Sequence, residues 1–386
     1  MPTVSISRRG EDRARAGHPW IYRSDVTAAS AAPGDLVQVV GARGRPIGSA
    51  LFSDRSEITL RMVSFGPASA PPDFLRERIA AAMAYRESLK LDATAYRLVH
   101  GEADRIPSLI VDRYGDHLVL QALSQGIDRR VREIVAALVD AVHPAGILAR
   151  NDPRVRLLEG LDQHVEVLHG TVPERLEVRE GVVTYEVDPW RGQKTGLFLD
   201  QRENREAARR YARGRLLDAF SYNGGFALAL APACESVLAI DISEDAVARI
   251  GANAARNGLT NVEARAMNVF DELRELERIG ARFDTIVLDP PAFAKNKAAV
   301  PKALSGYKEI NLRALKLLEP GGFLVTCSCS YNVSEPMFLD VVAAAAADAP
   351  AEIALVEKRA QGRDHPILMN VPETYYLKCL ILRKLA

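Results

Sequence analysis

Two cysteines near the carboxyl terminus lie in a setting that favours nucleophilic chemistry. Cys327 and Cys329 follow the apolar run 323–326, and on an extended chain residues two apart face the same side. A thiolate is a strong nucleophile, so one of the pair could attack an electrophilic carbon while the other is its neighbour. Free cysteines are also common as small buried apolar residues, which is our interpretation of Cys234 and Cys379. No Cys or His cluster with ligand spacing surrounds the pair, so we expect no metal.

A carboxylate next to consecutive prolines is the second chemical feature. Asp289-Pro-Pro-Ala-Phe293 follows the apolar run 285–288. Two prolines can neither continue a helix nor pair within a central ladder, so they predict a rigid turn at the carboxyl end of a strand. That turn would hold Asp289 at the mouth of a site, with Phe293 able to pack a nucleobase, as chemistry on a flipped base requires. His365 is a lone candidate acid or base, and lone histidines are more often structural.

A loop with paired glycines predicts a cofactor without a pyrophosphate. The apolar run 216–220 leads into Phe220-Ser-Tyr-Asn-Gly-Gly-Phe226, which lacks the third glycine of the dinucleotide fingerprint. Asp241 ends the next apolar run, where a carboxylate can accept both ribose hydroxyls, and Asn268 could reach an adenine edge. These features favour S-adenosylmethionine and disfavour an NAD-dependent oxidoreductase. The predicted cofactor-binding residues are Asp218, Phe220, Ser221, Tyr222, Asn223, Gly224, Gly225, Asp241, Asn268 and Asp289.

A helix N-cap is the competing structural role for the two acidic residues that end these runs. The alternative is strongest for Asp241, because Ser243 and Asp245 follow it and either could equally begin the next helix. Asp218 and Asp241 end successive predicted strands with one helix between them. That joint pattern favours cofactor binding over capping.

Such residues come together only if a parallel sheet aligns them. Short apolar runs alternate with helical stretches over residues 180–386, which predicts a doubly wound α/β domain with ligands at the carboxyl ends of its strands. Residues 73–175 show the order β-β-α-β of a compact α+β module. Residues 1–66 show short strands and turns, a small β-barrel pattern, and residues 65–72 resemble a linker.

The overall composition excludes several classes of protein. In 386 residues, 50 Lys and Arg balance 50 Asp and Glu, so nucleic-acid binding would depend on local patches rather than on bulk charge. Residues 1–66 hold nine basic against six acidic residues, a small excess compatible with RNA contact. The chain shows no run of 18 apolar residues, no signal peptide and no disulfide framework, so we expect a cytoplasmic protein without a membrane partner.

Taken together, several motifs resemble one family of enzymes. The chain is similar to the class I S-adenosylmethionine-dependent cytosine-C5 methyltransferases of large-subunit (23S) ribosomal RNA that carry a PUA domain. The resemblance covers nearly the whole chain and rests on His18–Trp20, Gln193–Arg202, Phe220–Phe226, Asp289–Phe293, Gly306–Asn311, Ser328–Ser330 and Asp364–Pro366. It implies a PUA β-barrel (1–66), a central α+β module (73–175) and a Rossmann-like methyltransferase domain (180–386). The implied partner is rRNA, and a second copy of the chain in a homodimer is a further candidate.

The resemblance also implies catalytic roles. It places the nucleophile in Ser-Cys-Ser, here Cys329. Asp289 would be the group that donates a proton to cytosine N3. A related branch of the family has Thr-Cys-Ser, which would point to Cys327, but that branch has a cysteine in its proline motif that this chain lacks. We therefore favour Cys329 and keep Cys327 as its rival. The group that removes the carbon 5 proton is unassigned, with Asp289 or water as candidates.

Two other functions compete with this one. An amino-group methyltransferase would grip an exocyclic amine with the Asp289–Phe293 loop and would need no cysteine. A noncatalytic RNA-binding protein would retain the fold while its amino-terminal barrel did the work.

Overall fold

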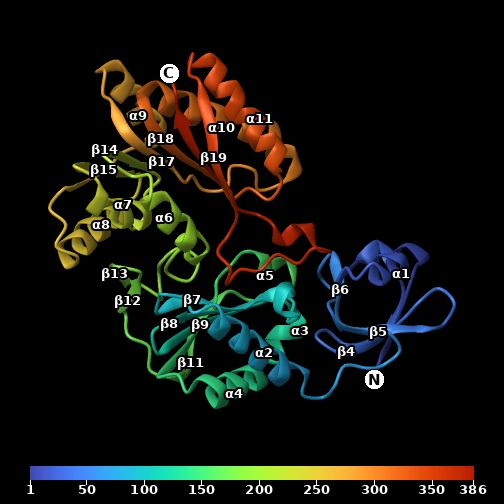
Figure 1. The fold of residues 1–386 in the computed structure, drawn as a ribbon. Helices are drawn as coiled ribbons and strands as arrows, with labels where there is room; N and C mark the ends of the chain where they lie inside the picture. Colours follow the sequence, from blue (N-terminus) through green and yellow to red (C-terminus); the bar gives the residue numbers. More distant parts are fainter. The chain divides into compact units, whose positions relative to one another are not determined.

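The computed structural model describes all residues, 1–386, and divides them into two compact units (Figure 1). Unit 1 contains Met1–Val178, Val187–Leu197 and Arg363–Thr374. Unit 2 contains Arg179–Glu186, Phe198–Gly362 and Tyr375–Ala386. None of the helices combines the length and the hydropathy needed to cross a lipid bilayer.

Unit 1 begins with a six-stranded sheet in the hydrogen-bonded order β2-β6-β5-β4-β1-β3. The short strands expected within residues 1–66 are present, and they include β4 and β6. In β4 the side chains of Val37 and Val39 are fully buried and their neighbours are half-buried, the alternation of a strand with one face on a core. The elements are β1 (Thr3–Ile6), α1 (Arg8–Arg15), β2 (Trp20–Tyr22), β3 (Val26–Ser30), β4 (Leu36–Val40), β5 (Pro46–Phe52) and β6 (Ile58–Phe65).

A second sheet of unit 1 has the order β11-β10-β9-β8-β7. Strands β8 and β9 form a hairpin, since they pair antiparallel about a turn in which Gly115 has φ +61°. The elements are α2 (Phe74–Ser88), β7 (Ala95–His100), β8 (Leu109–Tyr114), β9 (His117–Ala122), α3 (Gln125–Asp128), α4 (Val131–Val142), β10 (Gly146–Asn151), α5 (Val155–Leu158) and β11 (His164–Gly170). A separate two-stranded sheet follows, formed by β12 (Leu176–Glu180) and β13 (Val183–Val187).

The two sheets of unit 1 are joined by a buried carboxylate. Glu159 is fully buried and accepts a hydrogen bond from Ser53 at 2.7 Å and an ion-paired hydrogen bond from Arg61 at 2.6 Å. Removing Arg61 would leave the buried charge of Glu159 uncompensated, which is strongly destabilising. The predicted boundary at residues 65–72 therefore lies inside one compact unit, and the division of this unit into a barrel and a module stays a prediction.

Unit 2 contains a seven-stranded sheet in the order β16-β15-β14-β17-β18-β20-β19, which confirms the predicted doubly wound fold. The first five strands are parallel, and β20 runs antiparallel to both of its neighbours. The strands are β14 (Arg215–Ala219), β15 (Ser236–Asp241), β16 (Val262–Ala266), β17 (Phe283–Leu288), β18 (Leu318–Ser328), β19 (Ile353–Arg359) and β20 (Lys378–Lys384). The helices are α6 (Arg202–Arg209), α7 (Gly225–Leu230), α8 (Glu244–Arg256), α9 (Val269–Arg278), α10 (Val300–Leu317) and α11 (Glu335–Asp348).

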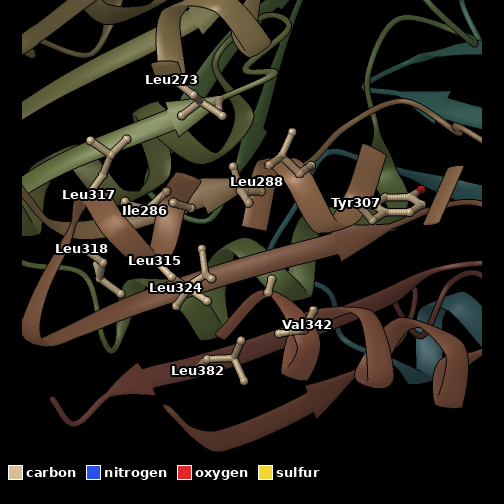
Figure 2. Close-up of a cluster of buried hydrophobic side chains, with 14 of the residues drawn as sticks. Leu273, Ile286, Leu288, Tyr307, Leu315, Leu317, Leu318, Leu324, Val342 and Leu382 are labelled. Atoms are coloured by element: carbon tan, nitrogen blue, oxygen red, sulfur yellow. The ribbon is translucent and has the colours of Figure 1, made fainter. Parts of the chain in front are cut away.

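The strand order creates a switch point between β14 and β17. From β14 the chain proceeds outward through β15 and β16, then returns to β17 on the other side of β14. Ligands of open α/β sheets bind at such a point, outside the carboxyl ends of the strands. A buried apolar layer fixes these ends, with Ile286 and Leu288 of β17 and Leu324 of β18 against Leu315 and Val342 (Figure 2). Each fully buried side chain of this type contributes about 1.5–3 kcal/mol.

Candidate active site

Asp218, at the end of β14, carries a buried oxygen without a partner. Its side chain is 1% exposed, and Oδ2 accepts a hydrogen bond from the Ala227 amide at 2.8 Å, while Oδ1 has no hydrogen-bond partner. Burial raises the pKa of Asp218 to about 7, and the charges of Asp289 and Asp241 add to the effect. An unsatisfied buried acceptor is costly, so this oxygen suits a ligand that brings a donor or a positive charge.

The loop after β14 adopts backbone conformations that are unusual for its residues. Phe220 and Tyr222 have φ of +67° and +52°, the left-handed region that costs non-glycine residues energy, and Gly224 has φ +86°. A Cβ on Gly224 would lie 3.1 Å from the Leu228 side chain, and Gly225 begins α7. Strain of this kind persists where surrounding contacts impose it and is concentrated at ligand-binding loops.

The contacts that hold the strained loop after β14 in place come largely from Ser221. Its amide donates to the Ile240 carbonyl at 3.0 Å, and its hydroxyl accepts from the Ile240 amide at 3.1 Å and donates to the Asp218 carbonyl at 2.6 Å. The loop is thereby tied to β15. Tyr222 and Asn223 are nearly buried in the same loop, at 8% and 3% exposure.

Asp241 is not a helix cap. Its Oδ2 accepts from the Tyr222 amide at 2.9 Å and its Oδ1 from the Ser243 amide at 3.0 Å, while Ser243 itself caps α8. A carboxylate offers about four acceptor sites, so Asp241 can tie down the loop and still accept from a ligand. Ile242 beside it is 72% exposed, an apolar side chain that the sequence analysis did not single out.

Asn268 performs a capping role that competes with the predicted one. Its Oδ1 accepts from the Phe270 amide at 3.0 Å and the Asp271 amide at 3.4 Å, which makes it the N-cap of α9. Its side-chain amide NH₂, which can only donate, is the group left for an adenine ring.

A hydrogen-bonded chain holds Asp289. Arg359 Nε donates to Asn204 Oδ1 at 3.1 Å, Asn204 Nδ2 donates to Gln201 Oε1 at 2.6 Å, and Gln201 Nε2 donates to Asp289 Oδ1 at 2.8 Å. A guanidinium can only donate, so Asn204 must turn its oxygen to Arg359 and its NH₂ group to Gln201. Gln201 must then turn its oxygen to Asn204 and its NH₂ group to Asp289. Asp289 Oδ1 is therefore held as an acceptor, and the sequence analysis assigned no role to the three residues that hold it.

The structure separates the two candidate cysteines. β18 ends at Ser328, so the alternation expected to place both on one side does not extend to Cys329. Cys327 is fully buried opposite Cys379 of β20, and this burial raises the pKa of Cys327 well above the ordinary thiol value. Cys329 is half-buried, and its Sγ donates to the Pro290 carbonyl at 3.6 Å, next to Asp289.

The other two cysteines fit a structural role. Cys379 is fully buried, as predicted, while Cys234 is half-buried, and burial raises its pKa to about 11.

Both serines of Ser328-Cys-Ser330 contact one tyrosine of α10. The Tyr307 hydroxyl accepts from Ser328 Oγ at 3.0 Å and lies 2.9 Å from Ser330 Oγ, which also accepts from the Ala294 amide at 3.1 Å. The loop that carries Cys329 is thus fastened to the end of the proline motif. This explains why serine flanks the cysteine on both sides.

Phe293, expected to pack a base, belongs to an aromatic cluster. Its ring centroid lies 4.7 Å from that of Tyr307, 6.0 Å from Phe270 and 6.3 Å from Phe220. The cluster links the loops that follow β14, β16 and β17, which the sequence did not indicate.

His365 lies in unit 1, whereas Asp289 and Cys329 lie in unit 2. It is 2% exposed, with its ring 5.1 Å from that of His100, and the adjacent Asp364 accepts from the Arg97 amide at 2.9 Å. These contacts favour the structural interpretation of the 364–366 motif.

The switch point of the sheet holds a strained loop and a buried carboxyl oxygen without a partner, an arrangement that suits a cationic nucleoside cofactor. The similarity of the sequence to known protein families agrees with this interpretation. Residues 129–383 match the family model described as S-adenosylmethionine-dependent methyltransferase, and residues 4–65 match a PUA-like domain. The chain belongs to this methyltransferase family.

Its curated relatives share one description. The chain is 40% identical over 392 aligned residues to "Ribosomal RNA large subunit methyltransferase I" of Tolumonas auensis, with 99% of each chain covered. It is 37% identical over 388 residues to the protein of the same name from Vibrio cholerae, with 98% of each covered.

Solved structures show the same fold. A Streptococcus mutans protein described as a SAM-dependent methyltransferase superposes with a TM-score of 0.85 at 20% identity, covering 99% of this chain and 100% of its own. A methyltransferase complexed with SAH gives the same score and coverage at 21% identity. The predicted fold and the predicted cofactor, S-adenosylmethionine, are therefore confirmed.

Proposed function

We propose that this protein transfers a methyl group from S-adenosylmethionine to carbon 5 of a cytosine in large-subunit (23S) rRNA, through a covalent adduct with Cys329. The observation that carries the proposal is the half-buried Cys329 beside the Asp-Pro-Pro turn, where its rival Cys327 is closed off in the core. The names of the relatives support rRNA as the substrate.

The residues at the ends of β14, β15 and β16 would hold the cofactor, which supplies an electrophilic methyl group when bound. Asp218 Oδ1 would accept from one of its donors and offset its positive charge, and Asp241 would accept from the ribose hydroxyls. Asn268 would donate to the adenine ring, and Ile242 offers adenine an exposed apolar surface.

Cys329 and Asp289 would activate the cytosine. Carbon 5 of cytosine is a poor nucleophile. When a Cys329 thiolate adds its electron pair to carbon 6, the electrons of the carbon 5–carbon 6 double bond shift toward N3. N3 then takes a proton, and carbon 5 becomes enamine-like and able to accept the methyl group. Covalent catalysis thus divides one difficult step into easier ones.

The chain from Arg359 determines which oxygen of Asp289 gives the proton. Because Oδ1 accepts from Gln201, we assign the proton for N3 to Oδ2. After methyl transfer, Asp289 as a carboxylate or a water takes the carbon 5 proton. The carbon 5–carbon 6 double bond forms again, the electron pair of the sulfur–carbon bond returns to Cys329, and N3 releases the proton that it took earlier to solvent.

Nucleoside analysis tests the proposal. The purified protein is incubated with 23S rRNA and methyl-labelled S-adenosylmethionine, and the RNA is digested and separated by mass spectrometry. We expect label in 5-methylcytidine. Label in N4-methylcytidine would instead support the amino-group alternative, and bound cofactor and RNA without any transfer would support the noncatalytic one.

A further inference from the structure

We propose that Lys378 is a positioning residue whose ammonium group pairs with Cys329 and holds it as a thiolate. The use of that thiolate rests on the proposed function. Lys378 begins β20, directly opposite Ser328 of β18, and is 2% exposed. Its Nζ donates to the carbonyl of Ser330, the residue after Cys329, at 2.7 Å and to that of Tyr376 at 2.9 Å.

The environment of Lys378 lacks the usual compensation for a buried charge. The acceptors of Lys378, on Ser330 and Tyr376, are neutral carbonyls, whereas buried charges are normally paired with an opposite charge. Burial lowers the pKa of Lys378 to about 8, while the charges of Cys329 and Glu335 raise it, so the amine is still largely protonated at neutral pH. A thiolate at Cys329 would supply a missing counter-charge.

The other charged groups nearby leave this role to Lys378. Glu335 of α11 is already bonded to Lys358 at 2.7 Å and to the Tyr375 hydroxyl at 2.6 Å. Tyr307 of α10 is neutral because burial raises its pKa. Asp289, on the turn that Cys329 contacts through Pro290, carries the proton for N3 in the proposed reaction and so brings no positive charge to the thiolate.

The pairing acts at two points of the reaction. Before RNA binds, the Cys329 thiol gives its proton to solvent and no longer donates to the Pro290 carbonyl, and the nearby ammonium stabilises the electron pair left on Sγ until it forms the bond to carbon 6. When the product leaves, that pair returns to Sγ and the same ammonium stabilises it. Lys378 itself neither gives nor takes a proton.

Alkylation of the intact protein by iodoacetamide tests this without RNA or cofactor. The rate of modification of Cys329 is followed against pH by peptide mass spectrometry. We expect the midpoint in the unaltered protein to lie below the ordinary thiol value of about 8.5. In Lys378→Met it should rise by about one pH unit or more, which makes alkylation near neutral pH about tenfold slower. Lys378→Arg, which keeps the charge, should restore most of the low midpoint.

Lys384→Met is the matched control. Lys384 lies on the same strand and also donates to two backbone carbonyls, those of Leu315 at 3.0 Å and Leu318 at 2.8 Å. Its replacement removes the same kind of contacts and should leave the Cys329 profile unchanged. Calorimetric binding of S-adenosylmethionine shows whether each variant retains its fold.

Either of two results overturns the proposal: a midpoint in the unaltered protein at or above the ordinary value, or a Lys378→Met profile that coincides with the unaltered one. The first result needs no variant, so a folding defect cannot obscure it. A low midpoint together with label in N4-methylcytidine would contradict the carbon 5 chemistry and leave the charge pairing intact.

Discussion

Replacing Asp218 by asparagine should change the stability of the cofactor-free protein more favourably at pH 8 than at pH 5. Asp218 is a buried carboxyl whose Oδ1 has no partner, so its pKa in the folded state, about 7, lies above the ordinary value of 3.8. Between these two values the folded state binds a proton that the unfolded state has lost. The stability of the unaltered protein therefore falls as pH rises through this interval, and asparagine does not titrate.

The magnitude follows from the same two values. The interval from 3.8 to about 7 corresponds to about 4 kcal/mol, of which about 2–3 kcal/mol is lost between pH 5 and pH 8. The new amide would leave a buried donor unpaired, at a cost of about 1–3 kcal/mol, but this cost is the same at both pH values. The change with pH is thus the informative quantity. The variant should also bind S-adenosylmethionine more weakly, since a charge-assisted contact is lost.

Hydrogen exchange of the β14 amides, monitored as the urea concentration is raised, measures the free energy of unfolding of the region that contains the substitution. Tryptophan fluorescence would not, because Trp20 and Trp190 both belong to unit 1. The expected result is a variant whose advantage over the unaltered protein grows by about 2–3 kcal/mol from pH 5 to pH 8. An advantage that is constant or shrinks with pH would refute a charge penalty at Asp218.

Three further variants test other parts of the protein. Asp241→Ala should weaken S-adenosylmethionine binding by about 1.5–3 kcal/mol, because a charged hydrogen bond to ribose is lost, and unchanged affinity in calorimetry would remove Asp241 from the site. Tyr307→Phe removes the hydroxyl shared by two serines. It should lower the methylation rate with cofactor affinity intact, and an unchanged rate would show that the serines need no clamp. In the exposed β4–β5 loop, Arg43→Gln with Arg45→Gln should reduce the slope of log affinity for rRNA against log salt by about 2, and an unchanged slope would exclude phosphate contact there.

The fold could be predicted because its signals are local. The inner parallel strands β14 and β17 of unit 2 are almost entirely buried, so runs such as 285–288 stand out as continuous apolar segments between helices. The Asp289 turn was equally local, since two prolines determine it. The compact unit that joins residues 1–66 to the central module was not foreseen, because it depends on Glu159 meeting Arg61 across nearly a hundred residues.

Much of the site's support could not be predicted. Gln201, Asn204 and Lys378 are ordinary polar residue types that reach Asp289 or the Ser-Cys-Ser loop only through the folded sheet. The choice between Cys327 and Cys329 depends on where β18 ends, and strand ends are the least predictable feature of a sequence. The capping role of Asn268 was not among our expectations, although the residue directly precedes α9.

The central claim is that Cys329 forms a covalent bond with cytosine, and a trapped adduct tests it most directly. With rRNA that contains 5-fluorocytosine at the target position, fluorine cannot leave as the carbon 5 proton does, so the adduct should persist as a slow band on a denaturing gel. The unaltered protein and Cys327→Ala should both give the band, while Cys329→Ala should lose both the band and methylation. If Cys327→Ala alone loses the band, Cys327 is the nucleophile, and if methylation survives both substitutions, no cysteine adduct lies on the pathway.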